Sequence, residues 1–194
     1  MRLSELFREV EFDGSIKNDA DINLVTDDSR LVRPGSLFVC IRHRSFDGHT
    51  AALDALASGA AAVVTQDRLG LENELHVADS RSAYARLCAA LCNHPERKLR
   101  MIGVTGTNGK TTVTTLIRNI LSDSGTKTLL TGTVCNRLGD ENLPSGLTTP
   151  KPPELYSLLS RAVSRGCKAC VMEASSQALA QGRLEGIDFD AAVF

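Results

Sequence analysis

The chain has 194 residues, 42% of them hydrophobic, and its 22 basic and 23 acidic side chains leave a formal net charge of -1. This length and apolar content can supply the core of one large or two small globular domains. The balanced charge excludes a chain-wide basic surface for nucleic acid, and no apolar run reaches the roughly 18 residues of a membrane span. Since residues 1–10 also lack a signal-peptide core, we expect a cytoplasmic protein with neither a nucleic-acid nor a membrane partner.

The first half of the sequence alternates short β-branched runs with helical stretches. The expected strands are residues 22–26, 36–41, 60–65 and 75–79. A helix with apolar spacing follows the second of them and stops at Gly59. Ser80 or Ser82 is expected to cap another helix, which ends in the polar stretch 93–98, where we place a domain boundary.

The second half begins with an apolar strand, 101–106, that runs into a glycine-rich loop. The helix after this loop carries its apolar face at Val113, Leu116, Ile117, Ile120 and Leu121. A strand at 126–134 follows, and then a polar loop rich in Gly, Asn and Asp.

A further helix opens with Pro152 and stops at Gly166. Its expected buried face is Leu155, Leu158, Leu159, Ala162 and Val163. Strands at 167–173 and 189–194 complete an α/β pattern, which indicates a largely parallel sheet with helices on both faces. We therefore expect a small N-terminal α/β domain, 1–98, followed by the first half of a phosphate-loop domain, 99–194.

The last expected strand has no layer after it, so the sequence looks cut short. With part of the second sheet missing, 168–173 and 189–194 are expected to be exposed edges that favour marginal stability or self-association. The six cysteines fall largely in apolar stretches, which favours buried thiols. Cys167 and Cys170 have metal or redox spacing but no second pair, so packing is favoured over zinc or redox chemistry.

The segment "GVTGTNGKTT" (103–112) carries the clearest chemical signal. A strand, a glycine turn and a helix start bring backbone N–H groups and a helix N-terminus to one point, which forms an anion site. Lys110 would meet the β- and γ-phosphates, and Thr111 would offer a hydroxyl to Mg²⁺. Gly103 lies one position too early for the usual phosphate-loop spacing, but Gly106 and Gly109 keep the functional part, so a plain glycine turn is the weaker interpretation.

Three other groups are candidates. Glu173 ends the apolar run "CVME", where phosphate-loop proteins often hold a metal-binding acid, although such a glutamate can also be the first solvated residue after a strand. The loops "DDSR" (27–30) and "RHRSFDGH" (42–49) follow strands and could hold an acidic ligand, or be solvated turns. No Ser-His-Asp arrangement is evident.

Together these motifs resemble one family. The loop with the displaced glycine is similar to the ATP loop of the Mur ligases and the related folylpolyglutamate synthetases. "DDSR", "RPGSLFVCIRHRSFDGH" and "GAAAVV" resemble the N-terminal domain of MurE and MurF ligases, and "TTP" (148–150) with "MEASSQALAQGRLEGIDFDAAVF" resembles the MurE type.

The resemblance implies a monomeric bacterial enzyme of peptidoglycan synthesis that uses ATP and Mg²⁺. Its substrate would be UDP-N-acetylmuramoyl-L-alanyl-D-glutamate, whose glutamate carboxylate is phosphorylated by ATP. The amine of a diamino acid, meso-diaminopimelate or L-lysine, would then attack the acyl phosphate. Phosphorylation makes this chemically reasonable, because a carboxylate is a poor electrophile until one oxygen leaves as phosphate.

Matching the family motifs residue by residue assigns the following roles. ATP would contact Gly106, Thr107, Asn108, Gly109, Lys110, Thr111 and Thr112. The metal ligands would be Thr111 and Glu173, and the catalytic residues Lys110 and Glu173. The UDP end would contact Ser29, Arg30, His43, Arg44, Ser45 and Phe46. The muramoyl dipeptide would contact Thr148, Thr149, Ser175, Gln181 and Arg183, the last through a guanidinium suited to carboxylate or phosphate.

The sequence departs from the family pattern in two respects. Gln177 stands where many members have histidine, so its role is open. The family continues past Phe194 with a carbamylated, metal-binding lysine and a domain that selects the amino acid, so the chain alone is expected to be inactive. Two alternatives are a non-catalytic module that binds ATP without turnover, and a MurF-like ligase.

Overall fold

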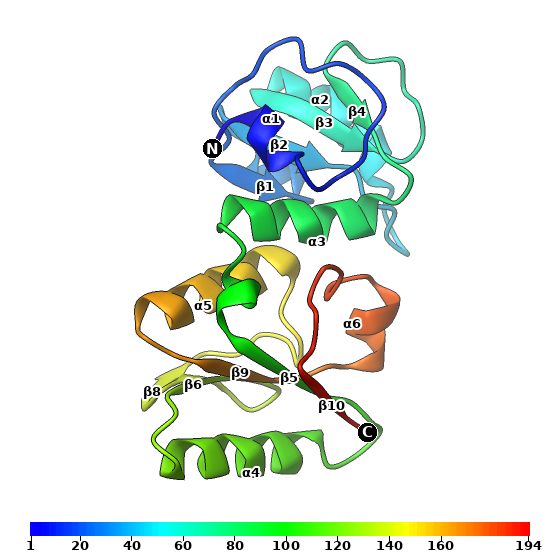
Figure 1. Ribbon diagram of the computed structural model, residues 1–194. Coiled ribbons are helices and arrows are strands. Elements are labelled where there is room, and N and C mark those ends of the chain that lie inside the picture. The colour runs from blue at the N-terminus through cyan, green and yellow to red at the C-terminus, as the bar shows by residue number, and fades with distance from the viewer. The chain divides into compact units, whose positions relative to one another are not determined.

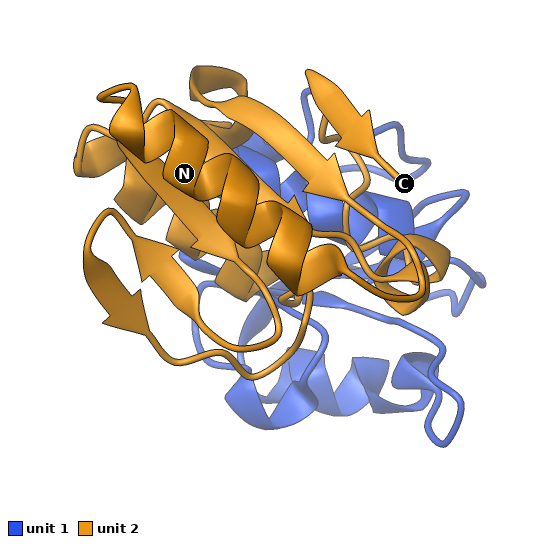
Figure 2. Ribbon diagram, turned by 90° about the horizontal axis from the view of Figure 1, so that it is seen from below, with its two compact units in different colours: residues 1–91 blue, residues 92–194 orange.

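The computed structural model describes residues 1–194 and divides into two compact units, Met1–Leu91 and Cys92–Phe194 (Figures 1 and 2). Each unit has its own parallel strands with helices packed against them, which confirms the expected α/β class. The functional boundary expected after residue 98 stays a prediction.

The first unit is built on a parallel sheet of four strands in the order β1-β2-β3-β4. The strands are β1 (Leu24–Thr26), β2 (Ser36–Val39), β3 (Ala60–Thr65) and β4 (Glu74–His76). The helices are α1 (Leu3–Leu6), α2 (Ala52–Ala57) and α3 (Ser80–Leu91), with short 3-10 turns η1 (Ser29–Leu31) and η2 (Gly48–Ala51). All four strands expected in this half are therefore present; β3 has the expected bounds, and the other three are shorter.

The core of the first unit includes a cluster of buried apolar side chains from its strands and from α2. Phe38 and Val63 are fully buried and pack in one cluster with Ala52 and Ala55 of α2. The α3 helix packs against β1. Its cap is Asp79, whose Oδ1 accepts from the backbone N–H of Arg81 at 2.9 Å, so the helix start is fixed by a carboxylate and not by the expected serine.

The second unit has a six-stranded sheet in the order β10-β5-β9-β6-β7-β8. Its strands are β5 (Arg100–Val104), β6 (Thr128–Thr131), β7 (Asn136–Leu138), β8 (Glu141–Leu143), β9 (Ala169–Glu173) and β10 (Ala191–Val193). β10, β5, β9 and β6 are parallel, and β7 and β8 add an antiparallel hairpin. The polar loop expected after β6 is thus mostly this hairpin.

The strand order corrects the expectation of two exposed edges. β9 lies between β5 and β6, and all of its residues are buried, so this segment is a central strand. Only β10 of the two lies at an edge, and its residues are exposed.

Two long helices cover opposite faces of this sheet (Figure 1). They are α4 (Lys110–Asp123) and α5 (Pro152–Ser164), accompanied by the short helices η3 (Pro95–Lys98) and α6 (Ser176–Ala180). Four of the five positions expected on the buried face of α5 are buried, and Val163 is half-buried. Gly166 has φ +78°, which fits its expected role as the stop of α5.

The α4 helix differs from the expectation. Leu116 and Ile120, on its apolar face, are 56% and 67% exposed, whereas Thr114 and Arg118 are buried. Arg118 Nη2 donates to the carbonyl oxygen of Gly139 at 2.7 Å, in the turn between β7 and β8. The covered face of α4 packs on β6, β9 and β5, and the turn of the unexpected hairpin accounts for the burial of Arg118.

All six cysteines are free thiols, four of them buried. Burial raises the pKa of Cys40 to about 12 and also raises the pKa of Cys170, which suppresses thiolate chemistry at both positions. No group of three or more His, Cys, Asp or Glu side chains is arranged to hold a metal ion. None of the helices combines the length and the apolar character needed to cross a membrane.

Candidate functional site

Three neighbouring parallel strands of the second unit end at the same edge. Val104 of β5 is in register with Glu173 of β9, and Thr131 of β6 with Met172 of β9. The segments that follow these strand ends, including the glycine loop after β5, therefore lie together. The carboxyl edge of a parallel sheet is the usual position of a ligand site in α/β proteins.

The glycine loop has the geometry of an anion cradle. Gly106 has φ +127° and Gly109 has φ +80°, values that side chains rarely tolerate. A Cβ atom added at Gly109 would meet no heavy atom within 4 Å, so the loop is open at this point. Gly109 also caps α4 without a side-chain hydrogen bond, which leaves the first N–H groups of the helix available to an anion.

Lys110 and Thr111 stand at the start of α4. The ammonium of Lys110 donates to the carbonyl oxygen of Gly106 at 2.6 Å, so it rests on the loop itself. The hydroxyl of Thr111 donates to Glu173 Oε1 at 2.9 Å. The loop residues Thr107 and Asn108 are exposed, as is Thr112 in the first turn of the helix.

The displaced glycine of the motif has a packing role. Gly103 lies inside β5, and a Cβ atom placed on it would come within 2.9 Å of the Phe189 ring. Such a contact is too short for a real Cβ atom, so this position requires glycine unless the ring moves. The open part of the glycine loop therefore begins at Gly106.

Glu173 is held by donors from two neighbouring segments. Its residue surface is only 1% exposed. Besides Thr111, the backbone N–H of Thr133 donates to Oε1 at 3.1 Å and the Thr133 hydroxyl donates to Oε2 at 2.8 Å. A Cβ atom at Gly132 would overlap Oε1 and lie 2.9 Å from the carboxyl carbon, so the missing side chain makes room for the carboxylate. Glu173 is therefore not a solvated residue after a strand.

The Thr111 and Glu173 side chains form a donor set that suits Mg²⁺. Both offer oxygen, the ligand type that this cation prefers, and Mg²⁺ commonly takes only one or two protein ligands alongside phosphate oxygens and water. The hydroxyl proton of Thr111 points to Glu173, which leaves its lone pairs for a cation. These two residues therefore fit a nucleotide-bound Mg²⁺ ion.

The residues assigned to the peptide part of a substrate lie beside Glu173. Thr149 is buried, donates to the Glu173 carbonyl oxygen at 2.7 Å and accepts from the Ser175 N–H at 3.0 Å. Arg183 Nη1 donates to the Thr149 carbonyl oxygen at 2.7 Å, and Arg183 Nη2 donates to Gln181 Oε1 at 2.6 Å. One polar network thus joins these residues.

Thr148 and Gln177 have different surroundings. The Thr148 hydroxyl lies 3.1 Å from the Thr133 hydroxyl, which connects it to the Glu173 carboxylate. Ser175 caps α6 by accepting from the Ala178 N–H at 3.2 Å. Gln177 lies exposed on α6, and nothing in its position assigns it a role.

In the first unit, Asp27 brings the two candidate loops together. Its carboxylate is nearly buried; Tyr84 Oη donates to Oδ1 at 3.1 Å, and His43 Nε2 lies 3.3 Å from Oδ2. Burial raises the pKa of Tyr84, which keeps this phenol a donor. Ser29 begins η1 in the first loop, and Arg30 pairs with Asp28 at 2.6 Å while its side chain stays 87% exposed.

Asp47 and His49 hold the second loop in place through hydrogen bonds. His49 is buried, its Nδ1 lies 2.7 Å from Asp47 Oδ1, and its Nε2 accepts from the Gln66 N–H at 3.1 Å. This pairing assigns the proton to Nδ1. The hydrogen bonds from His49 lower the pKa of Asp47 to about 2. The anchored loop also carries Arg44, Ser45 and Phe46, all of which are exposed.

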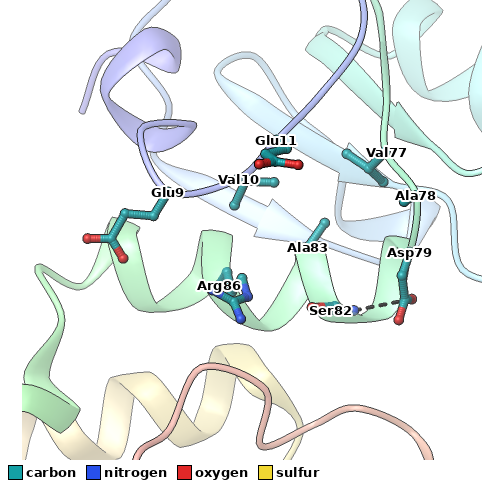
Figure 3. A pocket seen from close by; sticks show the side chains of 9 residues that line it. All are labelled: Glu9, Val10, Glu11, Val77, Ala78, Asp79, Ser82, Ala83 and Arg86. Atoms are coloured by element: carbon teal, nitrogen blue, oxygen red, sulfur yellow. Dashed lines mark hydrogen bonds between the residues drawn. The ribbon is translucent and has the colours of Figure 1, made fainter.

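A cavity of about 310 Å³ lies elsewhere in the first unit (Figure 3). Its charged lining is Glu9, Glu11, Asp79 and Arg86. Three carboxylates against one guanidinium disfavour a nucleotide diphosphate. None of the residues predicted to bind a ligand lines it, so this cavity does not enlarge the candidate site.

The residues that sequence reasoning missed share one property. Gly132 and Thr133 follow β6, and they reach Glu173 only because β6 lies next to β9. Asp27 and His49 lie in the two candidate loops, but their contacts with Tyr84 and Gln66 join segments far apart along the chain. The sequence carries no local signal for these contacts, since they depend on strand order.

Comparison with known proteins identifies relatives for both halves of the chain. A family model described as "Mur ligase family, catalytic domain" matches residues 21–94, and one described as "Mur ligase middle domain" matches residues 104–194. A UDP-N-acetylmuramoyl-L-alanyl-D-glutamate–2,6-diaminopimelate ligase of Geobacillus kaustophilus is 45% identical over 175 residues, covering 90% of this chain and 36% of the relative. The ligase of the same name from Listeria monocytogenes is 38% identical over 196 residues, covering 100% of this chain and 40% of the relative.

A solved structure of a ligase of that name superimposes with a TM-score of 0.81 at 30% identity. The superposition covers 99% of this chain and 39% of the solved chain. The chain thus spans roughly two fifths of the length of the relatives it matches.

Proposed function

The chain belongs to the Mur ligase family, and from this premise we propose that a full-length protein carrying these two units is an ATP-dependent ligase of peptidoglycan synthesis. It adds a diamino acid to UDP-N-acetylmuramoyl-L-alanyl-D-glutamate. The observation that carries the proposal is the meeting of the glycine loop, Glu173 and the Thr149–Arg183 network at one sheet edge. That edge combines a place for nucleotide phosphates with polar groups for the acceptor carboxylate.

ATP is the proposed source of energy for bond formation. The glutamate carboxylate attacks the γ-phosphorus of ATP, which releases ADP and gives an acyl phosphate. The amine of the diamino acid then attacks the carbonyl carbon, and phosphate leaves with one of the original carboxylate oxygens. Lys110 and the N–H groups at the start of α4 stabilise the charge on the phosphates during the first step.

Mg²⁺ is the proposed metal, held by Thr111 and Glu173. When bound, it would neutralise charge on the nucleotide phosphates. Glu173 is suited to this role because its carboxylate is already oriented by hydrogen bonds before any ligand arrives. Preorganised groups of this kind require no rearrangement at the moment of reaction.

The substrate would be recognised at two places. Ser29, Arg30 and the loop His43–Phe46 are proposed for the UDP end, where Arg30 and Arg44 offer exposed guanidinium groups to the diphosphate. The residues proposed for the muramoyl dipeptide are Thr148, Thr149, Ser175, Gln181 and Arg183.

The names of the relatives favour meso-diaminopimelate over L-lysine as the amino acid added. A nucleotide-linked substrate and ATP place the proposed reaction in the bacterial cytoplasm, and the full-length protein is proposed to be a monomer.

Phosphate release by the full-length protein tests the proposal. We expect release from ATP only when both UDP-N-acetylmuramoyl-L-alanyl-D-glutamate and a diamino acid are present. Nucleotide binding without turnover would instead indicate a non-catalytic module. Turnover that requires D-alanyl-D-alanine and the UDP-linked tripeptide would indicate a MurF-like ligase.

A further inference from the structure

Thr133 supplies two of the three side-chain and backbone donors that reach the Glu173 carboxylate. We propose that Thr133 is a positioning residue that holds this carboxylate in the orientation needed to bind Mg²⁺ with the nucleotide. The inference rests on the proposed function, because it takes Glu173 as a metal ligand. It adds a residue of the loop after β6 to a site otherwise formed after β5 and at the end of β9.

The two donors of Thr133 contact different oxygens of the Glu173 carboxylate. Its N–H meets Oε1, the oxygen that also accepts from Thr111, and its hydroxyl meets Oε2. Donors on both oxygens fix the rotation of the carboxylate plane, which a single donor leaves free. Oε1 is thereby kept beside the Thr111 hydroxyl, the second oxygen offered to the cation.

The position of Thr133 argues against a packing role. Thr133 is exposed, whereas the carboxylate it holds belongs to a residue that is 1% exposed. Its side chain is therefore not required to fill a core, and removing the hydroxyl leaves no buried cavity. The neighbouring Gly132 has no Cβ atom to displace the carboxylate from these donors.

The hydroxyl of Thr133 also contacts the hydroxyl of Thr148. A hydroxyl has one proton, and a carboxylate oxygen can only accept it, so the proton of Thr133 is committed to Oε2. The Thr148 hydroxyl lies 3.1 Å from the Thr133 hydroxyl, as a second acceptor beside the carboxylate. Thr133 thus links the segment proposed for substrate to the metal-binding carboxylate.

Titrations of ADP into the 194-residue chain, with Mg²⁺ varied and with EDTA, test this role by calorimetry. Thr133→Val keeps the branched shape but removes the hydroxyl. We expect it to raise the Mg²⁺ concentration for half-saturation about ten-fold or more, the usual effect of losing a group that orients a metal ligand. The ADP affinity in EDTA should stay within two-fold or so of wild type, since the phosphate loop is unchanged.

Thr133→Ser restores the hydroxyl without the methyl group and should return the Mg²⁺ dependence to near the wild-type value. Thr126→Val provides a matched control, because Thr126 lies as far before β6 as Thr133 lies after it. Thermal melts of all variants check folding, and Thr133→Ala, which cannot overpack the site, replaces the valine variant if that fails to fold.

The outcomes separate the inference from the proposed function. If wild type binds ADP with no Mg²⁺ dependence, the metal role of Glu173 fails and this inference fails with it. If wild type depends on Mg²⁺ and Thr133→Val behaves the same way, only the role of Thr133 is wrong. Equal losses with Mg²⁺ and in EDTA, or no rescue by serine, would show a structural role and overturn the inference.

Discussion

Glu173 and its surroundings show how much a site depends on residues that contribute no reactive group. Gly132 contributes only the absence of a side chain, yet a Cβ atom there would occupy the position of Oε1. Thr111, at the start of α4, and Thr133, in the loop after β6, then approach the carboxylate. The position of the Glu173 carboxylate thus depends both on the groups that donate to it and on the space left by Gly132.

Gly132→Ala should displace the Glu173 carboxylate and weaken Mg²⁺-dependent ADP binding by about ten-fold or more. Binding in EDTA should change little, because the glycine loop remains intact. Gly146→Ala is the matched control, since a Cβ atom at Gly146 would meet no atom within 4 Å. Calorimetry with and without Mg²⁺ would contradict the account if both alanine variants bound like wild type.

The ionisation of Asp47 should make the stability of the first unit depend on pH. Its pKa is lowered to about 2, chiefly by hydrogen bonds from His49, against an ordinary value of 3.8. A lowered folded-state pKa contributes stability that is present above pH 3.8 and is lost as the pH falls through about 2. Because Asp47 is partly exposed, we expect this contribution to be about 1 kcal/mol.

Asp47→Asn should therefore lower the free energy of unfolding at pH 7 by about 1 kcal/mol. The difference from wild type should shrink steadily as the pH is lowered below 4. Urea unfolding at a series of pH values measures both quantities. A difference that stayed constant down to pH 2 would show that ionisation of Asp47 is not its source.

At the scale of elements, periodicity predicted which segments are helices and strands but not always which face is covered. For α5 the apolar face is the buried one, since Leu155 and Leu159 are fully buried. For α4 the exposed positions are Leu116 and Ile120, while Arg118 is buried against the β7–β8 turn. The local sequence does not predict the β7–β8 turn, because the hairpin lies in a segment whose composition is typical of a polar loop.

Replacing Leu116 and Ile120 together by glutamine should change the free energy of unfolding by no more than about 1 kcal/mol, as expected for exposed positions. Leu159→Ala in α5 should cost about 2–5 kcal/mol, because it leaves a cavity in the core. Chemical denaturation compares the two. A loss of similar size in both variants would mean that this face of α4 is covered in solution.

The candidate site was predictable to the extent that it follows local sequence. Lys110 and Thr111 could be assigned from the glycine loop, and Glu173 from its place at the end of an apolar run. Their meeting at one edge follows from parallel strands, which the alternating pattern indicated. Thr133 could not be found this way, because its contact with Glu173 requires β6 and β9 to be neighbours.

At the scale of the whole chain, β10 is an unprotected edge of the six-stranded sheet. All of its residues are exposed, and Phe194 beside it is 99% exposed. Exposed edge strands with apolar side chains readily pair with other chains. We therefore predict that the 194-residue chain self-associates as its concentration rises.

Val193→Lys should shift the chain towards monomer, since a charge on an edge strand opposes pairing. Val134→Lys is the control, because Val134 is 77% exposed but lies outside the strands. Sedimentation velocity over a range of concentrations measures the effect. A wild-type chain that remains monomeric at the highest concentration would contradict the prediction.

The central claim is that ATP is used to activate a carboxylate, and isotope transfer tests it most directly. The full-length protein would receive UDP-N-acetylmuramoyl-L-alanyl-D-glutamate labelled with ¹⁸O at both oxygens of both free glutamate carboxylates, together with ATP and meso-diaminopimelate. We predict that each phosphate released carries one ¹⁸O atom, because phosphate leaves with a carboxylate oxygen. Phosphate without label, formed while the amide bond is made, would contradict the account.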